Sequence, residues 1–112
     1  MFDETPELIA TLEYEAQVLA VQLVNAARNA GIPLIVISAR RSPQRNRDVG
    51  GAARSEHLFG RAFDVQVVGW TREQIPFWWW ESLGAYAEYL GLRWGGRFRS
   101  PDVNHFDLGL IA

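Results

Sequence analysis

The sequence contains no cysteine and no lysine. The absence of cysteine excludes disulfide bonds, thiolate metal sites and cysteine nucleophiles together. Any metal site must therefore use nitrogen and oxygen ligands. Histidine is also scarce, because only His57 and His105 are present.

Long hydrophobic runs are absent as well. No stretch approaches the roughly 20 apolar residues that a membrane-spanning helix needs, so no membrane span is expected. The first residues, 1–6, are acidic and lack the basic and apolar regions of a secretory signal peptide. As written, the chain is expected to be cytoplasmic, or to leave the cell by a route that it does not encode.

Neither sign of charge dominates, since 13 acidic and 11 basic residues give a formal net charge of −2. This balance provides no general attraction to nucleic acid, and no nucleic-acid partner is expected. A length of 112 residues predicts one domain, residues 1–112. The hydrophobic share of 48% and the five tryptophans allow that domain a core of its own.

Hydrophobic spacing predicts the elements. Apolar residues at intervals of three and four predict a helix over residues 6–30, with Thr5 as its N-cap and Gly31 as its end. A β-branched run at 34–37 predicts a buried strand, and the polar stretch 39–60 is interpreted as a long loop.

The second half alternates between strand and helix patterns. Residues 61–68 predict a strand with Asp64 on its more polar face. A capping box at Thr71 and Gln74 precedes a predicted helix that ends at Gly91. A short strand at 92–94 and a closing strand at 104–111 complete an α+β fold, in which a small, mostly antiparallel sheet is flanked by helices.

Three consecutive tryptophans, at 78–80, lie in the predicted helix. Consecutive helical positions point in three directions, so at most two of these side chains can share a face. Core packing is the favoured interpretation, with one exposed tryptophan left to contact a glycan strand, because sugar rings stack on indoles, or another partner.

Four groups could carry chemistry: His57, Asp64, His105 and Asp102. A catalytic zinc site uses three nitrogen or oxygen ligands and keeps one position open for water. A carboxylate three residues before the second histidine is suitably placed for a general base. The spacings alone are weak, and a loop histidine with a structurally bonded strand histidine is the competing interpretation.

The residues around these groups carry a resemblance. Residues 55–64 fit S-x-H-x-x-G-x-A-x-D, which resembles the signature of the zinc D-alanyl-D-alanine carboxypeptidase family, peptidase M15. That family also includes L-alanyl-D-glutamate endopeptidases and phage endolysins, and its fold is related to lysostaphin-type enzymes and the hedgehog domain. The segments at 37–43, 46–52, 94–96 and 102–107 are similar to further family motifs. The resemblance thus covers roughly residues 34–110, which it implies to be the catalytic core.

The resemblance implies a role for each matching residue. His57, Asp64 and His105 correspond to ligands of a Zn²⁺ cofactor, and Asp102 to the base that activates zinc-bound water. Arg41 corresponds to the arginine that stabilises the polarised carbonyl or a substrate carboxylate, and is favoured over its neighbour Arg40. Ser55 corresponds to a serine that helps hold the substrate near the metal. Asp107 could bond the back of His105 or only add polarity to its strand.

The implied substrate is the stem peptide of peptidoglycan, cut at either the D-Ala-D-Ala or the L-Ala-D-Glu bond. The alternatives are a zinc-containing module without catalysis and a phage virion component. The missing signal peptide is compatible with a phage lysis enzyme released through a holin, and the sequence does not indicate an oligomeric state.

Overall fold

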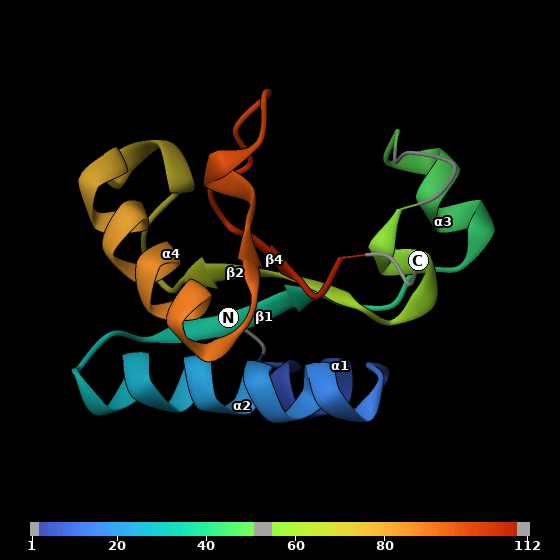
Figure 1. Ribbon diagram of the computed structural model, residues 1–112, viewed down its shortest axis with the longest axis horizontal. Helices are drawn as coiled ribbons and strands as arrows, with labels where there is room; N and C mark the ends of the chain where they lie inside the picture. Colours follow the sequence, from blue (N-terminus) through green and yellow to red (C-terminus); the bar gives the residue numbers. More distant parts are fainter. Residues whose placement is uncertain (1–2, 51–54, 110–112) are drawn as a thin grey trace.

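The computed structural model describes residues 3–50 and 55–109, which form helices, short 3₁₀ turns (η) and strands (Figure 1). Parts of the 46–52 motif and of the predicted closing strand lie outside these residues. In chain order the elements are α1 (Thr5–Ile9), α2 (Tyr14–Asn29), β1 (Leu34–Ser38), α3 (Pro43–Asp48), η1 (Glu56–Phe59), β2 (Ala62–Val67), η2 (Arg72–Gln74), α4 (Phe77–Leu90), β3 (Arg93–Trp94), η3 (Gly95–Arg97) and β4 (His105–Asp107).

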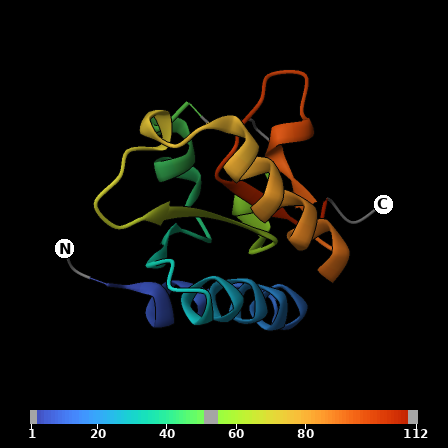
Figure 2. The same ribbon diagram turned by 90° about the vertical axis from the view of Figure 1, so that its left-hand side faces the viewer.

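The four strands form one sheet in the order β1-β2-β4-β3, and every neighbouring pair is antiparallel. Helices α1 and α2 form a layer beneath this sheet, while α3 and the β3–β4 connection rise from its other side (Figures 1 and 2). The predicted α+β class with a small antiparallel sheet is confirmed. Strands β2 and β4, which carry Asp64 and His105, occupy the interior of the sheet.

The prediction of one helix over residues 6–30 is wrong, because the chain breaks between α1 and α2. Glu13 has an extended backbone (ψ 153°), and its N–H donates to the carbonyl of Gly60, 2.8 Å away. Thr5 is not the N-cap either. Its hydroxyl is buried and accepts a hydrogen bond from the N–H of Val36, so it ties α1 to the sheet.

The segment 39–60 is not a continuous loop, because it contains α3 and η1. Ser42 caps α3 by accepting a hydrogen bond from the N–H of Arg45, and Pro43 occupies the first turn. Ser55 caps η1 in the same way, through the N–H of His57. A serine followed by proline is a helix-start signal, so α3 was recognisable in the sequence.

The helices and strands of the second half of the chain lie where the sequence predicts them, but their lengths differ from the prediction. The capping box of Thr71 and Gln74 is present but begins the short η2, while α4 starts after Pro76. Gly91 ends α4 with a left-handed backbone. The closing strand predicted at 104–111 is shorter, since β4 spans His105–Asp107 and the chain turns at Gly109, where φ is 77°.

The core lies between the sheet and helices α2 and α4. Its largest fully buried side chains include Trp80, Trp94, Phe63 and Phe106. Of the three consecutive tryptophans, Trp80 is buried and Trp78 is 66% exposed. The interpretation of that triplet as core packing with one exposed member is therefore confirmed. Among residues 3–50 and 55–109, no helix has both the length and the apolar character needed to cross a bilayer.

Helix α4 approaches β3 so closely that Gly84 tolerates no side chain. A Cβ at this position would lie 2.2 Å from the buried indole of Trp94. We expect Gly84→Ala to lower the unfolding midpoint by roughly 5–10 °C, because overpacking costs about 1–3 kcal/mol and exceeds the gain in helix propensity. Calorimetry would measure this shift, with Ser82→Ala on the exposed face as the control. An unchanged midpoint would show that Trp94 can move aside.

Candidate metal centre

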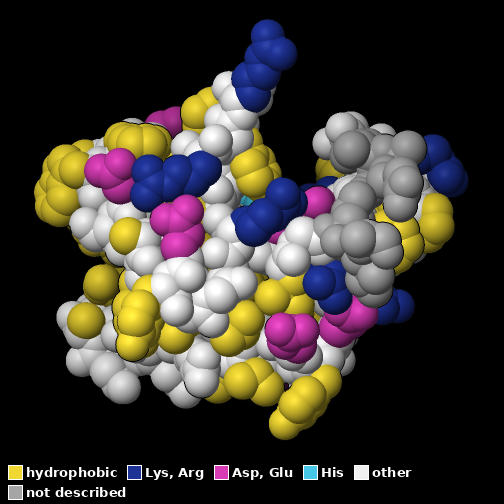
Figure 3. Space-filling model, in the orientation of Figure 1, with side chains coloured by type: hydrophobic (Ala, Val, Ile, Leu, Met, Phe, Trp, Pro, Cys, Tyr) yellow, Lys and Arg dark blue, Asp and Glu magenta, His cyan; other side chains and the backbone are white. Residues whose placement is uncertain are grey.

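The two histidines and Asp64 lie together, as predicted. The antiparallel pairing of β2 with β4 sets Asp64 opposite His105, and η1 brings in His57. The Oδ1 atom of Asp64 is 3.0 Å from Nδ1 of His105 and 3.3 Å from Nε2 of His57. Figure 3 shows histidine at the floor of a hollow between the β3–β4 connection and the α3 side of the molecule. Such a set of one carboxylate oxygen and two imidazole nitrogens could hold a metal ion.

The contacts of His57 leave one of its ring nitrogens free to bind a metal ion. Its Nδ1 donates to the carbonyl of Ala39, 2.6 Å away, which fixes the tautomer and leaves the lone pair on Nε2. Nε2 is buried and, within residues 3–50 and 55–109, is the only buried side-chain nitrogen or oxygen without a hydrogen-bond partner. Burying an unpaired acceptor is costly. A metal ion would use this atom, so the residues fit a metal.

His105 is held between two carboxylates. Its Nε2 lies 2.6 Å from Oδ2 of Asp107, while its Nδ1 faces Asp64. Burial favours the neutral imidazole, but hydrogen bonds to Asp107 and Asp64 outweigh it and raise the pKa of His105 to about 9. A metal ion must displace a proton from this ring. Of the two interpretations of Asp107, the bond to the back of His105 is confirmed.

Asp64 stays ionised although it is largely buried. Burial alone would raise the pKa of its carboxyl, but the hydrogen bond from His105 and the charge on that ring hold the pKa far below the usual range. The carboxylate is therefore available as a metal ligand over the whole physiological pH range.

A second group of ligand-type side chains, Glu56, His105 and Asp107, lies nearby. Arg93 already occupies this group, since its guanidinium is 2.6 Å from Asp107 and 2.8 Å from Glu56. A metal ion there would meet a fixed positive charge. The electrostatics therefore favour the group that contains His57.

The two adjacent arginines point to different places. Nη2 of Arg41 is 3.6 Å from Oδ2 of Asp64, and its Nη1 donates to the side chain of Asn46. Arg40 instead donates to the carbonyl of Phe59, away from the metal-binding group. Arg41 therefore lies where a positive charge can act beside the metal centre.

Ser55 and Asp102 lie near the ligands but contact other groups. Ser55 is almost buried, and its hydroxyl accepts from the N–H of His57. The carboxylate of Asp102 pairs with Nη1 of Arg72 at 3.2 Å, and its backbone carbonyl accepts from the N–H of His105. The chain thus places Asp102 beside His105, with its side chain partly exposed.

Sequence reasoning missed Asn46, Arg72 and Arg93. Asn46 is buried and accepts from Arg41, while Arg72 bridges the side chains of Asp102 and Asn104. The contacts of Arg72 and Arg93 join residues far apart in the sequence, so no local pattern predicts them. Asn46 lies only five residues from Arg41. The position of Asn46 within a family-like motif was the one available signal.

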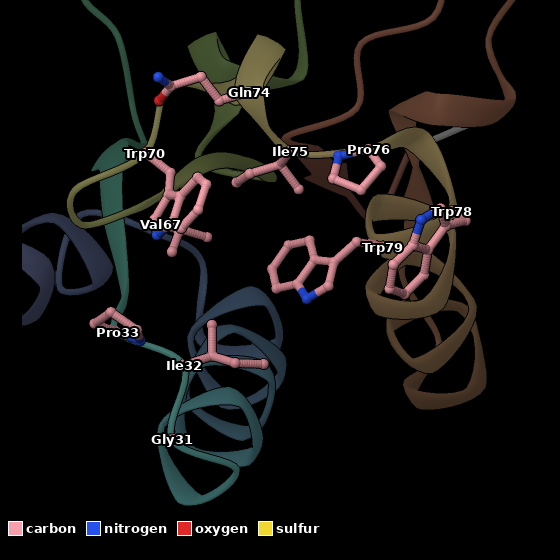
Figure 4. Close-up of a pocket in the computed structure, with 10 residues that line it drawn as sticks. All are labelled: Gly31, Ile32, Pro33, Val67, Trp70, Gln74, Ile75, Pro76, Trp78 and Trp79. Atoms are coloured by element: carbon pink, nitrogen blue, oxygen red, sulfur yellow. The ribbon is translucent and has the colours of Figure 1, made fainter.

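A separate pocket of about 300 Å³ lies at the far end of β2 (Figure 4). The indole of Trp79 reaches into it from α4, opposite Trp70. Its lining contains no charged side chain and shares no residue with the metal-binding group: Gly31, Ile32, Pro33, Val67, Trp70, Gln74, Ile75, Pro76, Trp78 and Trp79. The lining of this pocket therefore offers no side chain for acid–base chemistry.

The sequence matches the family described as Peptidase M15 over residues 3–79. This match includes His57 and Asp64 and ends before Asp102 and His105. No curated protein matches the chain.

Solved structures share the fold. The L-Ala D-Glu endopeptidase ChiX of Serratia marcescens is 23% identical, with a TM-score of 0.66 over 95% of this chain and 86% of its own. The D,D-pentapeptidase VanY from a VanB-type resistance cassette, solved as a mutant with Zn(II), is 17% identical, with a TM-score of 0.67 over 88% of this chain and 73% of its own. The LD-carboxypeptidase LdcB is 15% identical, with a TM-score of 0.69 over 86% of this chain and 58% of its own.

Proposed function

The chain belongs to the peptidase M15 family, and from this premise we propose that it is a zinc metallopeptidase acting on peptidoglycan stem peptides. The observation that carries the proposal is the buried Nε2 of His57, which has no hydrogen-bond partner and faces a carboxylate shared with a second histidine. His57, Asp64 and His105 would hold the ion. Zinc bound there would supply a Lewis acid that polarises the scissile carbonyl and lowers the pKa of water.

We assign Asp102 the role of general base. It would accept a proton from the attacking water and later give it to the departing amine. Its ion pair with Arg72 is partly exposed, and such pairs contribute only about 0–1 kcal/mol. The carboxylate can therefore leave Arg72 at little cost when a substrate binds.

Arg41 is assigned to the carbonyl oxygen or a carboxylate of the substrate. Its guanidinium is mostly buried, and Asn46 fixes one side of it. A fixed, permanently charged fork beside the metal centre suits an oxygen that gains negative charge in the transition state.

We expect Arg41→Met to lower kcat/KM by about 10²–10³-fold, the usual cost of losing one donor to a developing oxyanion. Assays with a synthetic stem peptide would measure the loss, and metal analysis would check that zinc remains bound. Arg40→Met is the matched control and should keep most activity, because Arg40 contacts Phe59 instead. A larger loss in the Arg40 variant would reverse this assignment.

Incubation of the zinc-loaded protein with purified peptidoglycan, followed by mass spectrometry of the new ends, tests the function. Free D-Ala would identify carboxypeptidase activity, and new N-terminal D-Glu would identify an endopeptidase. The structural neighbours are named for different stem-peptide bonds, so the shared fold does not select between them. No product from a metal-replete sample would favour the non-catalytic zinc module.

The substrate places the reaction at the cell wall. Release through a phage holin is the proposed route for a lysis enzyme, and a holin gene beside this one would support it. Presence of the protein in purified virions would favour the virion role instead.

A further inference from the structure

Arg93 contacts residues that support both of the histidines proposed to bind the metal, on the side away from the metal position. It lies on β3, at the edge of the sheet, and pairs with carboxylates next to each histidine. We propose that Arg93 is a positioning residue that sets the metal affinity of the site. This inference rests on the proposed metal centre and concerns metal binding before any substrate arrives.

The first connection runs through Asp107 to His105. Arg93 donates from Nε to Oδ1 of Asp107 at 2.6 Å and from Nη2 to Oδ2 at 3.2 Å, a two-point contact. Asp107 is fully buried, and its Oδ2 also meets Nε2 of His105 at 2.6 Å. The N–H of Gly109 donates to Oδ1. With its carboxylate plane fixed by these contacts, Asp107 directs the His105 ring so that Nδ1 faces the metal position.

The second connection runs through Glu56 to His57. Nη2 of Arg93 donates to Oε1 of Glu56 at 2.8 Å, and Glu56 begins the η1 turn that carries His57. Arg93 therefore links the edge strand β3 to η1, although η1 belongs to the connection between β1 and β2. Loss of this contact would loosen the one ligand that does not lie on a strand.

The third connection runs through Phe98. The guanidinium of Arg93 lies 5.4 Å from the centre of the Phe98 ring, and that ring lies 5.5 Å from the His105 ring. Phe98 therefore contacts both Arg93 and His105. The same side chain thus restrains His105 by a hydrogen-bonded route and by a packing route.

These contacts predict a loss of affinity and not of fold. Outer partners of metal-binding histidines typically contribute about 10–100-fold to metal affinity. Arg93 is 52% exposed, so its removal opens no large cavity, but it leaves Asp107 buried with fewer partners. We expect Arg93→Met to raise the Kd for Zn²⁺ by about 10–100-fold.

The experiment is a competition between the protein and a chromophoric chelator for Zn²⁺, at a temperature well below the unfolding midpoint of each metal-free variant. Arg97→Met is the matched control. Arg97 is 51% exposed, pairs with Glu81 and Glu88, and covers Trp94, but it contacts neither histidine segment. Its Kd should equal that of the unaltered chain.

Two further variants test the route. Arg93→Lys keeps the charge but cannot make the two-point contact, so its Kd should fall between those of Arg93→Met and the unaltered protein. In the Asp107→Asn background, Arg93→Met should raise the Kd for Zn²⁺ by a smaller factor than it does in the unaltered protein, because most of the proposed effect of Arg93 is exerted through Asp107. If Asp107→Asn does not fold, the comparison between the Kd values of Arg93→Lys and Arg93→Met tests whether the two-point contact is needed.

The outcomes separate this inference from the proposed function. Equal zinc affinity in the unaltered chain, Arg93→Met and Arg97→Met would overturn the role of Arg93 and leave the metallopeptidase proposal standing. Equal losses in Arg93→Met and Arg97→Met would also overturn it, since any edge arginine would then suffice. An unaltered chain that binds no zinc would overturn both.

Discussion

Asp102→Ala should keep its zinc and lose about 10²–10⁴-fold in kcat, the usual contribution of a positioned general base. The variant retains all three side chains proposed to bind the metal, and the backbone bond between the carbonyl of Asp102 and the N–H of His105 does not depend on the side chain. Metal analysis of the purified variant and a stem-peptide assay would together measure the separation of binding from turnover.

Two controls distinguish loss of the base from loss of its ion pair. Arg72→Met removes the partner of Asp102 but keeps the carboxylate, so it should be far more active than Asp102→Ala. Asp48→Ala removes an exposed aspartate whose side chain bonds Gln44, and it should behave as the unaltered enzyme. If Asp102→Ala also lost zinc, Asp102 would be a ligand, and the proposed division of roles would be wrong.

His57→Ala should have the largest effect of all, because it removes a ligand. We expect its zinc affinity to fall by more than the roughly 10–100-fold that loss of an outer partner costs, and its activity to fall to background at ordinary zinc concentrations. Buried His57 also bonds the carbonyl of Ala39, so the metal-free variant should be less stable than the metal-free parent. Zinc titration and thermal unfolding would measure the two effects.

Phe59→Ala provides the control for His57→Ala on the same turn. Phe59 is 45% exposed, and its side chain offers no metal ligand, so zinc affinity should be unchanged. Retention of stoichiometric zinc by His57→Ala would contradict the ligand assignment. It would favour the group formed by Glu56, His105 and Asp107 as the metal site.

Local patterns predicted the parts of the site that lie on strands. The two-residue period of β2 placed Asp64 on the more polar face, and the same period put His105 and Asp107 on one face of β4. The spacings did not reveal that Asp64 and His105 face each other. That expectation came from the resemblance to a known signature, and the strand register now shows the pair.

The features that sequence reasoning missed depend on contacts between distant residues. The break between α1 and α2 is stabilised by a hydrogen bond from the N–H of Glu13 to the carbonyl of Gly60. The hydrophobic periodicity of residues 6–30 cannot predict a contact with a residue so far along the chain. The same holds for Arg93, which joins Glu56 and Asp107 from two other elements. An arginine on a two-residue edge strand has no sequence signal that separates it from any exposed charge.

The order of strands has a mechanical consequence. Two of the three side chains proposed to bind the metal lie on interior strands that are hydrogen-bonded on both sides, whereas His57 lies in η1, near the β2 end of the connection between β1 and β2. An ion bound by all three would act as a cross-link between η1 and the sheet, and would close the part of the connection that contains α3 into a loop with both ends fixed. Amide exchange in η1 and α3 should therefore slow when zinc is added, while exchange within β2 and β4 changes much less.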